Sequence, residues 1–268
     1  MNVHTLCQLL EMPDEAMQLL DNDVLADTAW LSDDLIACYY NRATTAEGLK
    51  AIQAHLGEDP DGLRLLHVLL LLALDTWQGY EAAGIPQDIF VSTMKFVPRF
   101  LRTQMQQHGN WNFIWGWWFW RQLSMMEFRI GCLEYELVTN PDGSREISLH
   151  IPSDADLSPA SVDASFAAFR QFLAAHFPHW QDVPWVCDSW MMAPGLRAAL
   201  DPDSNILAFQ QLFEPVHSYD YEAVMDWVFP PHREISENLP ERTSLQRRLK
   251  ALLLAGTKIG CTKARLRR

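Results

Sequence analysis

Two short stretches of the sequence hold side chains that can transfer protons or attack carbonyl groups. His150 stands near the end of residues 145–152, whose alternating pattern predicts a β-strand. A histidine there can act as a general base, although a lone histidine is more often structural. The second stretch closes a short apolar segment, residues 183–190, and consists of Cys187, Asp188 and Ser189.

The second stretch allows two interpretations. A cysteine beside a base can act as a nucleophile, which makes Cys187 with His150 a candidate pair. Cys187 also follows Trp185 and Val186, which are typical of a core, and a buried cysteine would be inert. Residues 187–189 stand at the carboxyl end of a predicted strand, the edge where sites gather in open sheets.

These side chains need a sheet to position them. From residue 127 onward the order strand, strand, helix, strand, helix, strand, helix, helix predicts an α/β or α+β domain with a mixed sheet. Residues 127–138 alternate as one strand whose phase shifts at Cys132–Leu133, which indicates a β-bulge. The other predicted strands are residues 145–152, 183–190 and 205–216, and the predicted helices are residues 157–178, 193–200, 221–229 and 242–256.

The residues before this domain are predicted to be helical. Residues 62–84 carry apolar side chains all around a helix, which is typical of a helix buried between others. The helix expected to begin at Pro86 contains Pro98, which should kink it or end a segment. We therefore expect a helical N-terminal domain, residues 1–109, followed by the mixed-sheet domain, residues 110–268.

The composition limits the classes of function. The chain has 268 residues, 49% of them hydrophobic, and a formal net charge of −13. That charge repels nucleic acid and anionic lipid, so neither is expected as a main partner. The five cysteines form no CxxC pair, and the N-terminus lacks the basic start of a signal peptide, which together indicate a cytoplasmic protein. The most apolar run, residues 63–74, is too short to span a bilayer.

The C-terminal segment departs from this acidic balance. Between Glu241 and Arg268 there are nine Lys or Arg residues and one acidic residue. Such asymmetry can mark an anion-binding tail, and it also fits a solvated helix face with a tail that pairs with the acidic body.

No metal site is expected. Residues 201–205 lack the glycine and the distal glutamate of a calcium loop. Pro178 breaks the helix between His176 and His179, which counts against a zinc pair.

Several stretches together resemble one family. They are GIPQDIFVSTM at residues 84–94, FRIGCLEYEL at 128–137, LHIP at 149–152, LSPASVDAS at 157–165, VCDSWMMAPGLRAALDPDSNILAFQQLF at 186–213 and TSLQRRL at 243–249. In this order they are similar to a group of bacterial N-acyltransferases with a helical N-terminal domain and a GNAT-like C-terminal domain. A histidine usually stands between the cysteine and the serine of the VCDSW block in that family, whereas this chain has Asp188.

The resemblance implies a GNAT-like sheet and transfer of an acyl group from acyl-CoA, as co-substrate, to an amine. In such domains the pantetheine arm enters where two strands splay apart, and the pyrophosphate binds at a helix N-terminus. The catalytic candidates are then His150, Cys187, Asp188 and Ser189. The candidates to bind CoA are Ser153, Ser158, Ala160, Ser161, Arg247 and Arg248.

A non-catalytic alternative stays open. The junction before residues 157–178 lacks the glycine-rich phosphate-binding signature, and it carries Asp154, Asp156 and Asp163. These carboxylates would repel phosphate and would themselves stabilise the helix dipole. The same scaffold would then serve as a ligand-binding or interaction protein.

An aromatic stretch precedes the predicted sheet. Seven of the ten residues from Trp111 to Trp120 are aromatic and none is Lys or Arg, which counts against a nucleic-acid platform. The stretch is interpreted as the seam where the helical domain packs on the sheet, or as the wall of an apolar acyl pocket. The residues expected to line that pocket are Trp115, Trp118, Tyr135 and Trp190.

Overall fold

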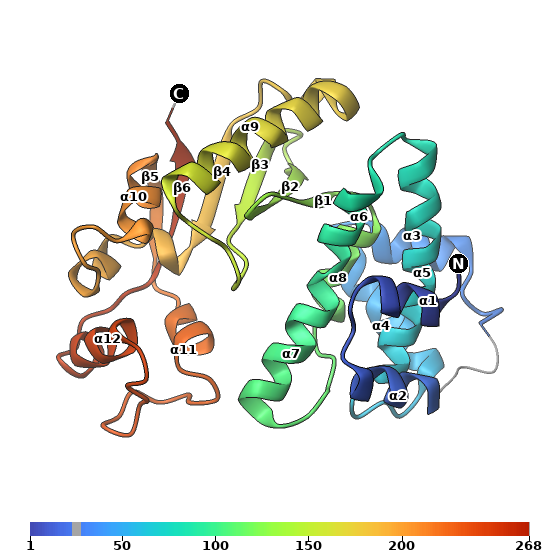
Figure 1. The fold of residues 1–268 in the computed structure, drawn as a ribbon, viewed down its shortest axis with the longest axis horizontal. Helices are drawn as coiled ribbons and strands as arrows, with labels where there is room; N and C mark the ends of the chain where they lie inside the picture. The colour runs from blue at the N-terminus through green and yellow to red at the C-terminus, as the bar shows by residue number, and fades with distance from the viewer. Residues whose placement is uncertain (23–27, 268) are drawn as a thin grey trace. The chain divides into compact units, whose positions relative to one another are not determined.

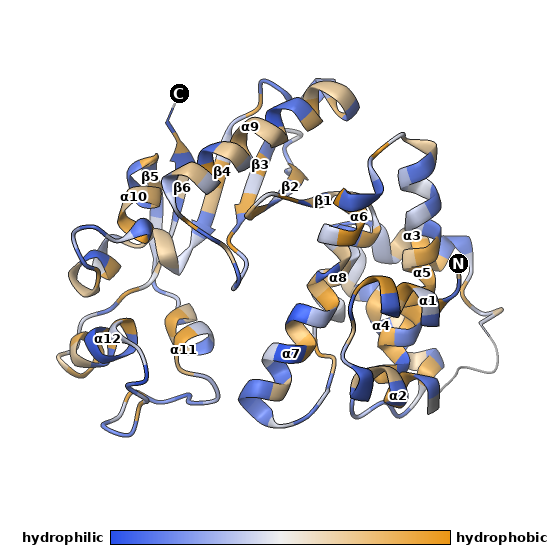
Figure 2. Cartoon of the chain, viewed as in Figure 1, coloured by the Kyte–Doolittle hydropathy of each residue, from blue (hydrophilic) through white to orange (hydrophobic). Residues whose placement is uncertain are grey.

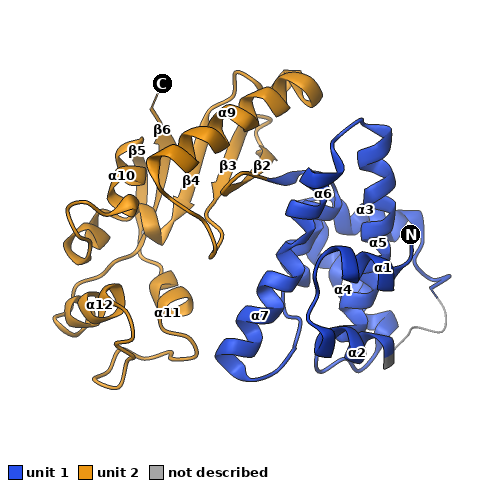
Figure 3. Ribbon diagram, viewed as in Figure 1, with its two compact units in different colours: residues 1–129 blue, residues 130–268 orange. Residues whose placement is uncertain are grey.

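The chain folds into two compact units, residues 1–129 and 130–268 (Figure 3). The computed structural model describes residues 1–22 and 28–267. The sequence predicts a boundary after Gly109, whereas the units divide after Arg129, because residues 116–123 form a helix that packs on other helices of the first unit. None of the helices among the described residues has the length and apolar character needed to cross a bilayer.

The first unit is helical, as predicted. Its helices are α1 (Val3–Leu9), α2 (Asp14–Asn22), α3 (Asp33–Tyr40), α4 (Thr45–Leu56), α5 (Leu63–Ala82), α6 (Gln87–Met94), α7 (Phe96–His108) and α8 (Gly116–Leu123). Helix α5 contacts α1, α2, α4, α6 and α8. Its buried side chains lie on all sides, which confirms the prediction of a helix enclosed by others.

The expected interruption near Pro98 is also present. Helix α6 ends at Met94, Lys95 separates it from α7, and α7 begins at Phe96. Pro98 therefore lies in the first turn of α7, where a missing backbone N–H breaks no helical hydrogen bond.

The aromatic stretch contributes to the core of this first unit. The Tyr39 hydroxyl donates a hydrogen bond to the Gly116 carbonyl at 2.5 Å, which ties α3 to the start of α8. A Cβ atom at Gly116 would lie 2.7 Å from Leu65, so α8 approaches α5 closely. Phe119 and Trp120 are buried. These rings therefore bury apolar area inside the helical unit.

The chain also forms a six-stranded mixed sheet with the order β1-β2-β3-β4-β6-β5 (Figure 1). Strand β1 spans the boundary between the units, and the other five strands belong to the second unit. The strands are β1 (Glu127–Ile130), β2 (Leu133–Thr139), β3 (Arg145–His150), β4 (Trp185–Ser189), β5 (Phe213–Tyr219) and β6 (Cys261–Leu266). Strand β3 is parallel to β4, and the pairs β2–β3, β4–β6 and β5–β6 are antiparallel. This confirms the predicted α+β class with a mixed sheet.

Helices and short 3-10 turns connect these strands. They are α9 (Pro159–His176), η1 (Pro178–Trp180), η2 (Trp190–Met192), η3 (Pro194–Ala199), α10 (Asn205–Gln211), α11 (Ala223–Val228) and α12 (Ser244–Leu254). Helix α9 makes the crossover that a parallel β3–β4 pair requires. A capping box starts α12, because Thr243 and Gln246 exchange hydrogen bonds with each other's backbone.

Three features of this unit differ from the prediction. Residues 127–138 form two strands, not one bulged strand, because the chain turns at Gly131–Cys132. Residues 205–216 begin as helix α10 before β5 starts at Phe213, because Ser204 caps a helical turn there. The third is an omission: β6 is the last strand in the chain, yet it lies between β4 and β5.

The two faces of the sheet differ in chemistry. The rings of Tyr135 on β2 and Trp185 on β4 pack on Phe169 of α9, with centroid distances of 3.8 and 5.3 Å. Since side chains alternate along a strand, residues next to these point to the opposite face. Hydrophilic and hydrophobic residues accordingly both occur along the strands in Figure 2. The face away from α9 carries the polar candidates, including His150 and Asp188.

The turn at Gly131 yields a prediction about stability. Gly131 has a φ of 64°, and a Cβ atom there would lie 2.9 Å from the Ser165 side chain. Gly131→Ala should therefore lower the free energy of unfolding by about 2–4 kcal/mol, from left-handed strain and a steric clash. Gly143→Ala is the matched control, because Gly143 has a φ of 81° and open space around it. The control should lose only about 1 kcal/mol in urea unfolding. Equal losses would contradict the close packing at Gly131.

Candidate active site

The sheet opens at the carboxyl ends of β3 and β4. The parallel pairing of these strands covers Ile147–Leu149 and Trp185–Cys187. Beyond the Leu149–Cys187 pair, His150 still pairs with β2, and Asp188 and Ser189 still pair with β6 on the other edge of β4, but β3 and β4 no longer pair with each other. The two parallel strands therefore part at this point, which is also where the chain crosses over through α9.

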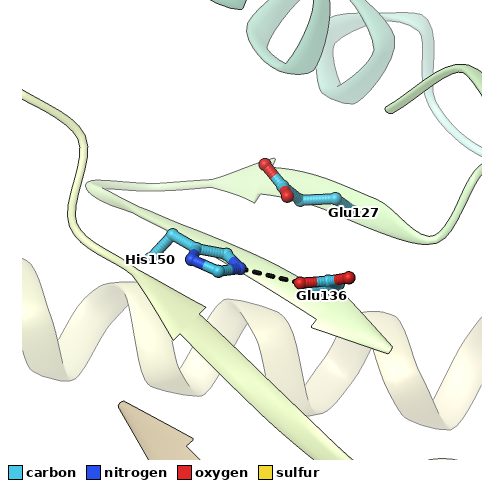
Figure 4. Close-up of side chains that lie close together, drawn as sticks. All are labelled: Glu127, Glu136 and His150. Carbon is cyan, nitrogen blue, oxygen red and sulfur yellow. Dashed lines mark hydrogen bonds and ion pairs between the residues drawn. The ribbon is translucent and has the colours of Figure 1, made fainter. Parts of the chain in front are cut away.

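His150 is held by a buried carboxylate. Its Nε2 atom lies 3.0 Å from Oε2 of Glu136 on β2 (Figure 4). The Glu136 side chain is only 3% exposed, whereas that of His150 is 21% exposed, so solvent reaches the imidazole. A carboxylate in this position orients a histidine and stabilises its protonated form.

Glu127 on β1, the first strand of the same sheet, completes a group of three. One ligand atom from each of Glu127, Glu136 and His150 lies within 4.8 Å of the others (Figure 4). Gln122 donates a hydrogen bond to Glu127 Oε1 at 2.6 Å. Two carboxylates and an imidazole are donors that a divalent cation accepts, and in the same geometry they orient one another. The sequence analysis did not foresee this group.

Asp188 lies beside a tyrosine that sequence reasoning missed. The Tyr219 hydroxyl on β5 donates to Asp188 Oδ1 at 2.9 Å. Burial and the neighbouring Asp188 carboxylate raise the pKa of Tyr219, so the phenol stays protonated near neutral pH. Asp188 is also the cross-strand partner of Lys263, whose ammonium group lies 2.7 Å from Glu146. Tyr219 and Lys263 belong to strands far along the chain, so no local pattern links them to Asp188.

The structure does not favour Cys187 as a nucleophile. Its side chain is fully buried on the α9 side of the sheet, and burial with the nearby Asp188 raises its pKa to about 12. The thiol form therefore predominates near pH 7, and only a thiolate is strongly nucleophilic. Ser189 has a structural contact: its hydroxyl accepts from Met191 N at 3.1 Å and caps η2.

The start of α9 already holds a carboxylate. Asp156 accepts hydrogen bonds from the backbone N–H and hydroxyl of Ser158, both at 2.9 Å, and from the hydroxyl of Ser161. These bonds lower the pKa of Asp156. Ser158 and Ser161 are therefore engaged, whereas Ser153 and Ala160 are exposed. A pyrophosphate at this helix would have to compete with Asp156.

The basic residues expected to neutralise phosphate have other partners. Arg247 donates to the Glu241 carbonyl, and Arg248 forms an ion pair with Asp201 at 2.6 Å. Lys258 pairs with Asp220 at 2.6 Å. To bind a phosphate, these three side chains would have to give up those contacts.

The four residues predicted to line an acyl pocket are divided between the two units. Trp115 and Trp118 belong to the first unit, where Trp115 packs on Phe100 and Arg121 lies over Trp118. Tyr135 is fully buried beneath α9 and cannot line an open pocket. Trp190 is half-buried against the apolar cluster around α12 and η3.

Comparison with models of protein families shows which family the chain belongs to. The model of the N-acyltransferase N-terminal domain matches residues 1–125, and that of the GNAT-like C-terminal domain matches residues 128–266. The chain belongs to this N-acyltransferase family. The junction between the two matches agrees with the division of this N-acyltransferase into units after Arg129.

Solved acyltransferase structures share its fold. One, in complex with decanoyl-CoA and teicoplanin, is 23% identical with a TM-score of 0.78, over 98% of this chain and 86% of that chain. A variant acyltransferase in complex with octanoyl-CoA is 22% identical with a TM-score of 0.79, over the same shares of 98% and 86%. A third, in complex with CoA and 10C-teicoplanin, is 20% identical with a TM-score of 0.72, over 100% and 99%. No curated protein matches this N-acyltransferase in sequence.

The carboxylate at the start of α9 yields a pH-dependent prediction. Because the pKa of Asp156 is lowered from 3.8, its ionised form stabilises the fold above pH 3.8, and this contribution is lost as the pH falls through the lowered value. Asp156→Asn should lower Tm by a few degrees at pH 7, and the difference should shrink below pH 3.8.

The control for this prediction is Asp163→Asn in the same helix. The structure shows no side-chain hydrogen bond for Asp163 among the described residues. The Asp163→Asn variant should therefore leave Tm nearly unchanged in thermal melts followed by circular dichroism. Equal losses in the two variants would indicate a general helix-dipole effect and contradict the specific role of Asp156.

Proposed function

We propose that this protein transfers an acyl group from acyl-CoA to a primary amine where β3 and β4 part. The observation that carries the proposal is the end of the parallel pairing at Leu149–Cys187, with His150 and Asp188 directly beyond it on the open face. Strand edges that stop pairing with each other can hydrogen-bond to the amide groups of a pantetheine arm. Family membership and the shared fold support the same reaction.

The chemistry requires one proton acceptor and an ordered exchange of bonds. The amine, protonated in water, gives a proton to His150, whose imidazole Glu136 orients. The neutral nitrogen attacks the thioester carbonyl, the C–N bond forms, and the C–S bond breaks. The departing thiolate takes the second proton that the nitrogen loses, CoA leaves as a thiol, and His150 releases the first proton to solvent.

In this proposal, Asp188 binds the amine that receives the acyl group. Its carboxylate is exposed, and Tyr219 holds it by a hydrogen bond at the parting of the strands. A carboxylate attracts an ammonium group and can fix the amine before it loses its proton. Cys187 takes no part, since its thiol is buried and its pKa is about 12.

The acyl chain and acceptor are proposed from the shared fold. Similar structures contain decanoyl-CoA, octanoyl-CoA and teicoplanin. We therefore take medium-chain acyl-CoA as the donor and an amino group of a glycopeptide or amino sugar as the acceptor to test first. The free state of Cys7, Cys38, Cys132, Cys187 and Cys261 supports a reducing, cytoplasmic setting.

A second function has observations in its favour. Asp156 occupies the helix start that would bind pyrophosphate, and Arg247, Arg248 and Lys258 are engaged elsewhere. These contacts favour a ligand-binding or interaction protein on the same scaffold. Turnover separates the two, because an enzyme releases CoA repeatedly and a binding protein does not.

The test measures CoA release by mass spectrometry. The protein is incubated with acetyl-, octanoyl- or decanoyl-CoA, with and without glucosamine or a glycopeptide that carries a free amine. We expect amine-dependent release. His150→Gln should lower kcat/KM by about a hundredfold or more, since a positioned general base contributes at least that much. Asp188→Asn should raise the KM for the amine more than it lowers kcat.

His179→Gln is the matched control, because His179 is an exposed histidine of η1 in the same unit. It should retain wild-type rates. No release with any donor would favour the binding function, and wild-type rates in His150→Gln would remove His150 from the mechanism.

A further inference from the structure

A recess lies at the opposite end of β4 from the candidate active site. Its volume is about 920 Å³, within the usual range of ligand sites, and it opens around Trp185 and Pro184, where β4 begins. Asp188 stands three residues further along the strand, a distance of about 10 Å. The recess is therefore separate from the parting of β3 and β4, and nothing in the acyl-transfer proposal uses it.

Three arginines are among the residues that line this recess. Arg170 comes from α9, and Arg265 and Arg267 come from β6 and the residue just after it. The guanidinium of Arg170 lies over the Trp185 ring, 4.9 Å from its centroid. Arg267 Nε donates to the Phe213 carbonyl at 3.3 Å. Both arginines are thus held in position and keep further N–H groups for a ligand.

These arginines lack carboxylate partners in a strongly acidic protein. Asp182 and Glu214 also line the recess, and Glu214 is the cross-strand neighbour of Arg265. Even so, within the part of the chain that the structure describes, none of the three arginines forms an ion pair. Like charges that gather without counter-ions repel one another, and a bound anion would relieve that repulsion.

The interior of the recess also has an apolar part. Leu173 and Trp185 are almost completely buried, and Val183 and Leu266 are half-buried. Arginine recognises carboxylate and phosphate oxygens in pairs, and it also stacks on flat rings. The lining therefore suits a ligand with one anionic group on a ring or a short apolar body.

We propose that this recess is a second binding site, which takes a small organic anion bearing a carboxylate or phosphate group through Arg170, Arg265 and Arg267. This site would give a role to part of the basic C-terminal segment. Arg265 and Arg267 belong to that segment, whose sequence allowed an anion-binding tail, whereas Arg247, Arg248 and Lys258 form internal contacts. The site does not depend on acyl transfer and would exist in a non-catalytic protein as well.

The test is calorimetric titration of the full chain with phenyl phosphate, benzoate and inorganic phosphate, with benzyl alcohol as the uncharged probe. Wild type should bind the aromatic anions in a salt-dependent manner and should not bind benzyl alcohol. The double variant Arg265→Gln/Arg267→Gln should bind them at least about tenfold more weakly, since even one lost charge-assisted hydrogen bond costs about that factor. If it fails to fold by circular dichroism, Arg170→Gln on the exposed surface of α9 supplies the same test.

Arg242→Gln is the matched control, because Arg242 is an exposed arginine of the same basic segment outside the recess. It should bind the probes as wild type does. The double variant His150→Gln/Asp188→Asn should also retain binding, which locates the probe away from the candidate active site. Absence of binding by wild type at millimolar concentration, or equal binding by the arginine variants, would overturn the proposal. So would loss of binding in the His150 and Asp188 variant.

Discussion

The short parallel contact between β3 and β4 is the constraint on which the second unit depends. Only three residue pairs are in register, from Ile147–Trp185 to Leu149–Cys187. Parallel strands cannot be joined by a tight turn, so the chain must cross over through α9 before β4 begins. The crossover covers one face of the sheet and leaves the carboxyl ends of both strands to diverge. The candidate active site and the start of α9 follow from this one connection.

The covered face supplies the rigidity that the open face needs. Aromatic rings of β2, β4 and α9 pack together beneath the sheet, and Ser165 of α9 accepts or donates a hydrogen bond with Tyr135 at 2.7 Å. Because alternate residues of each strand are fixed in this core, the residues between them project from the other face at defined positions. Glu134 is the direct cross-strand partner of His150. Glu136 stands two residues further along β2 and therefore points to the same face, as a diagonal neighbour of His150.

The sequence predicted the elements that have strong local signals. The α9 helix has a proline at its first position and a phenylalanine stripe, and β3 ends just before Pro152, so both elements were located correctly. Residues 205–216 combine a helix and a strand in a run too short for periodicity to separate them. Strand β6 was missed because Lys263 and Arg265 gave it a polar composition, although its small and apolar residues alternate with them.

The site was predictable only in part. His150 and Asp188 were found because they end recognisable strands. Glu136, Tyr219 and Lys263 were not, because strand pairing alone brings them there from distant parts of the chain. Burial also determines which side chains can react, and it could not be predicted from the sequence. Cys187 and Asp188 are neighbours, yet Cys187 is fully buried and Asp188 is exposed. Asp156 is hydrogen-bonded to Ser158 and Ser161 beside the start of α9, so this carboxylate is structural as well as electrostatic.

Hydrogen–deuterium exchange with and without decanoyl-CoA tests the central claim most directly. If acyl-CoA binds where β3 and β4 part, amides of residues 149–153 and 187–190 should exchange more slowly in its presence. Amides of β5 and of residues 181–185 at the other end of β4 should be unaffected. Protection confined to other segments, or none at all with saturating decanoyl-CoA, would contradict the placement of the site.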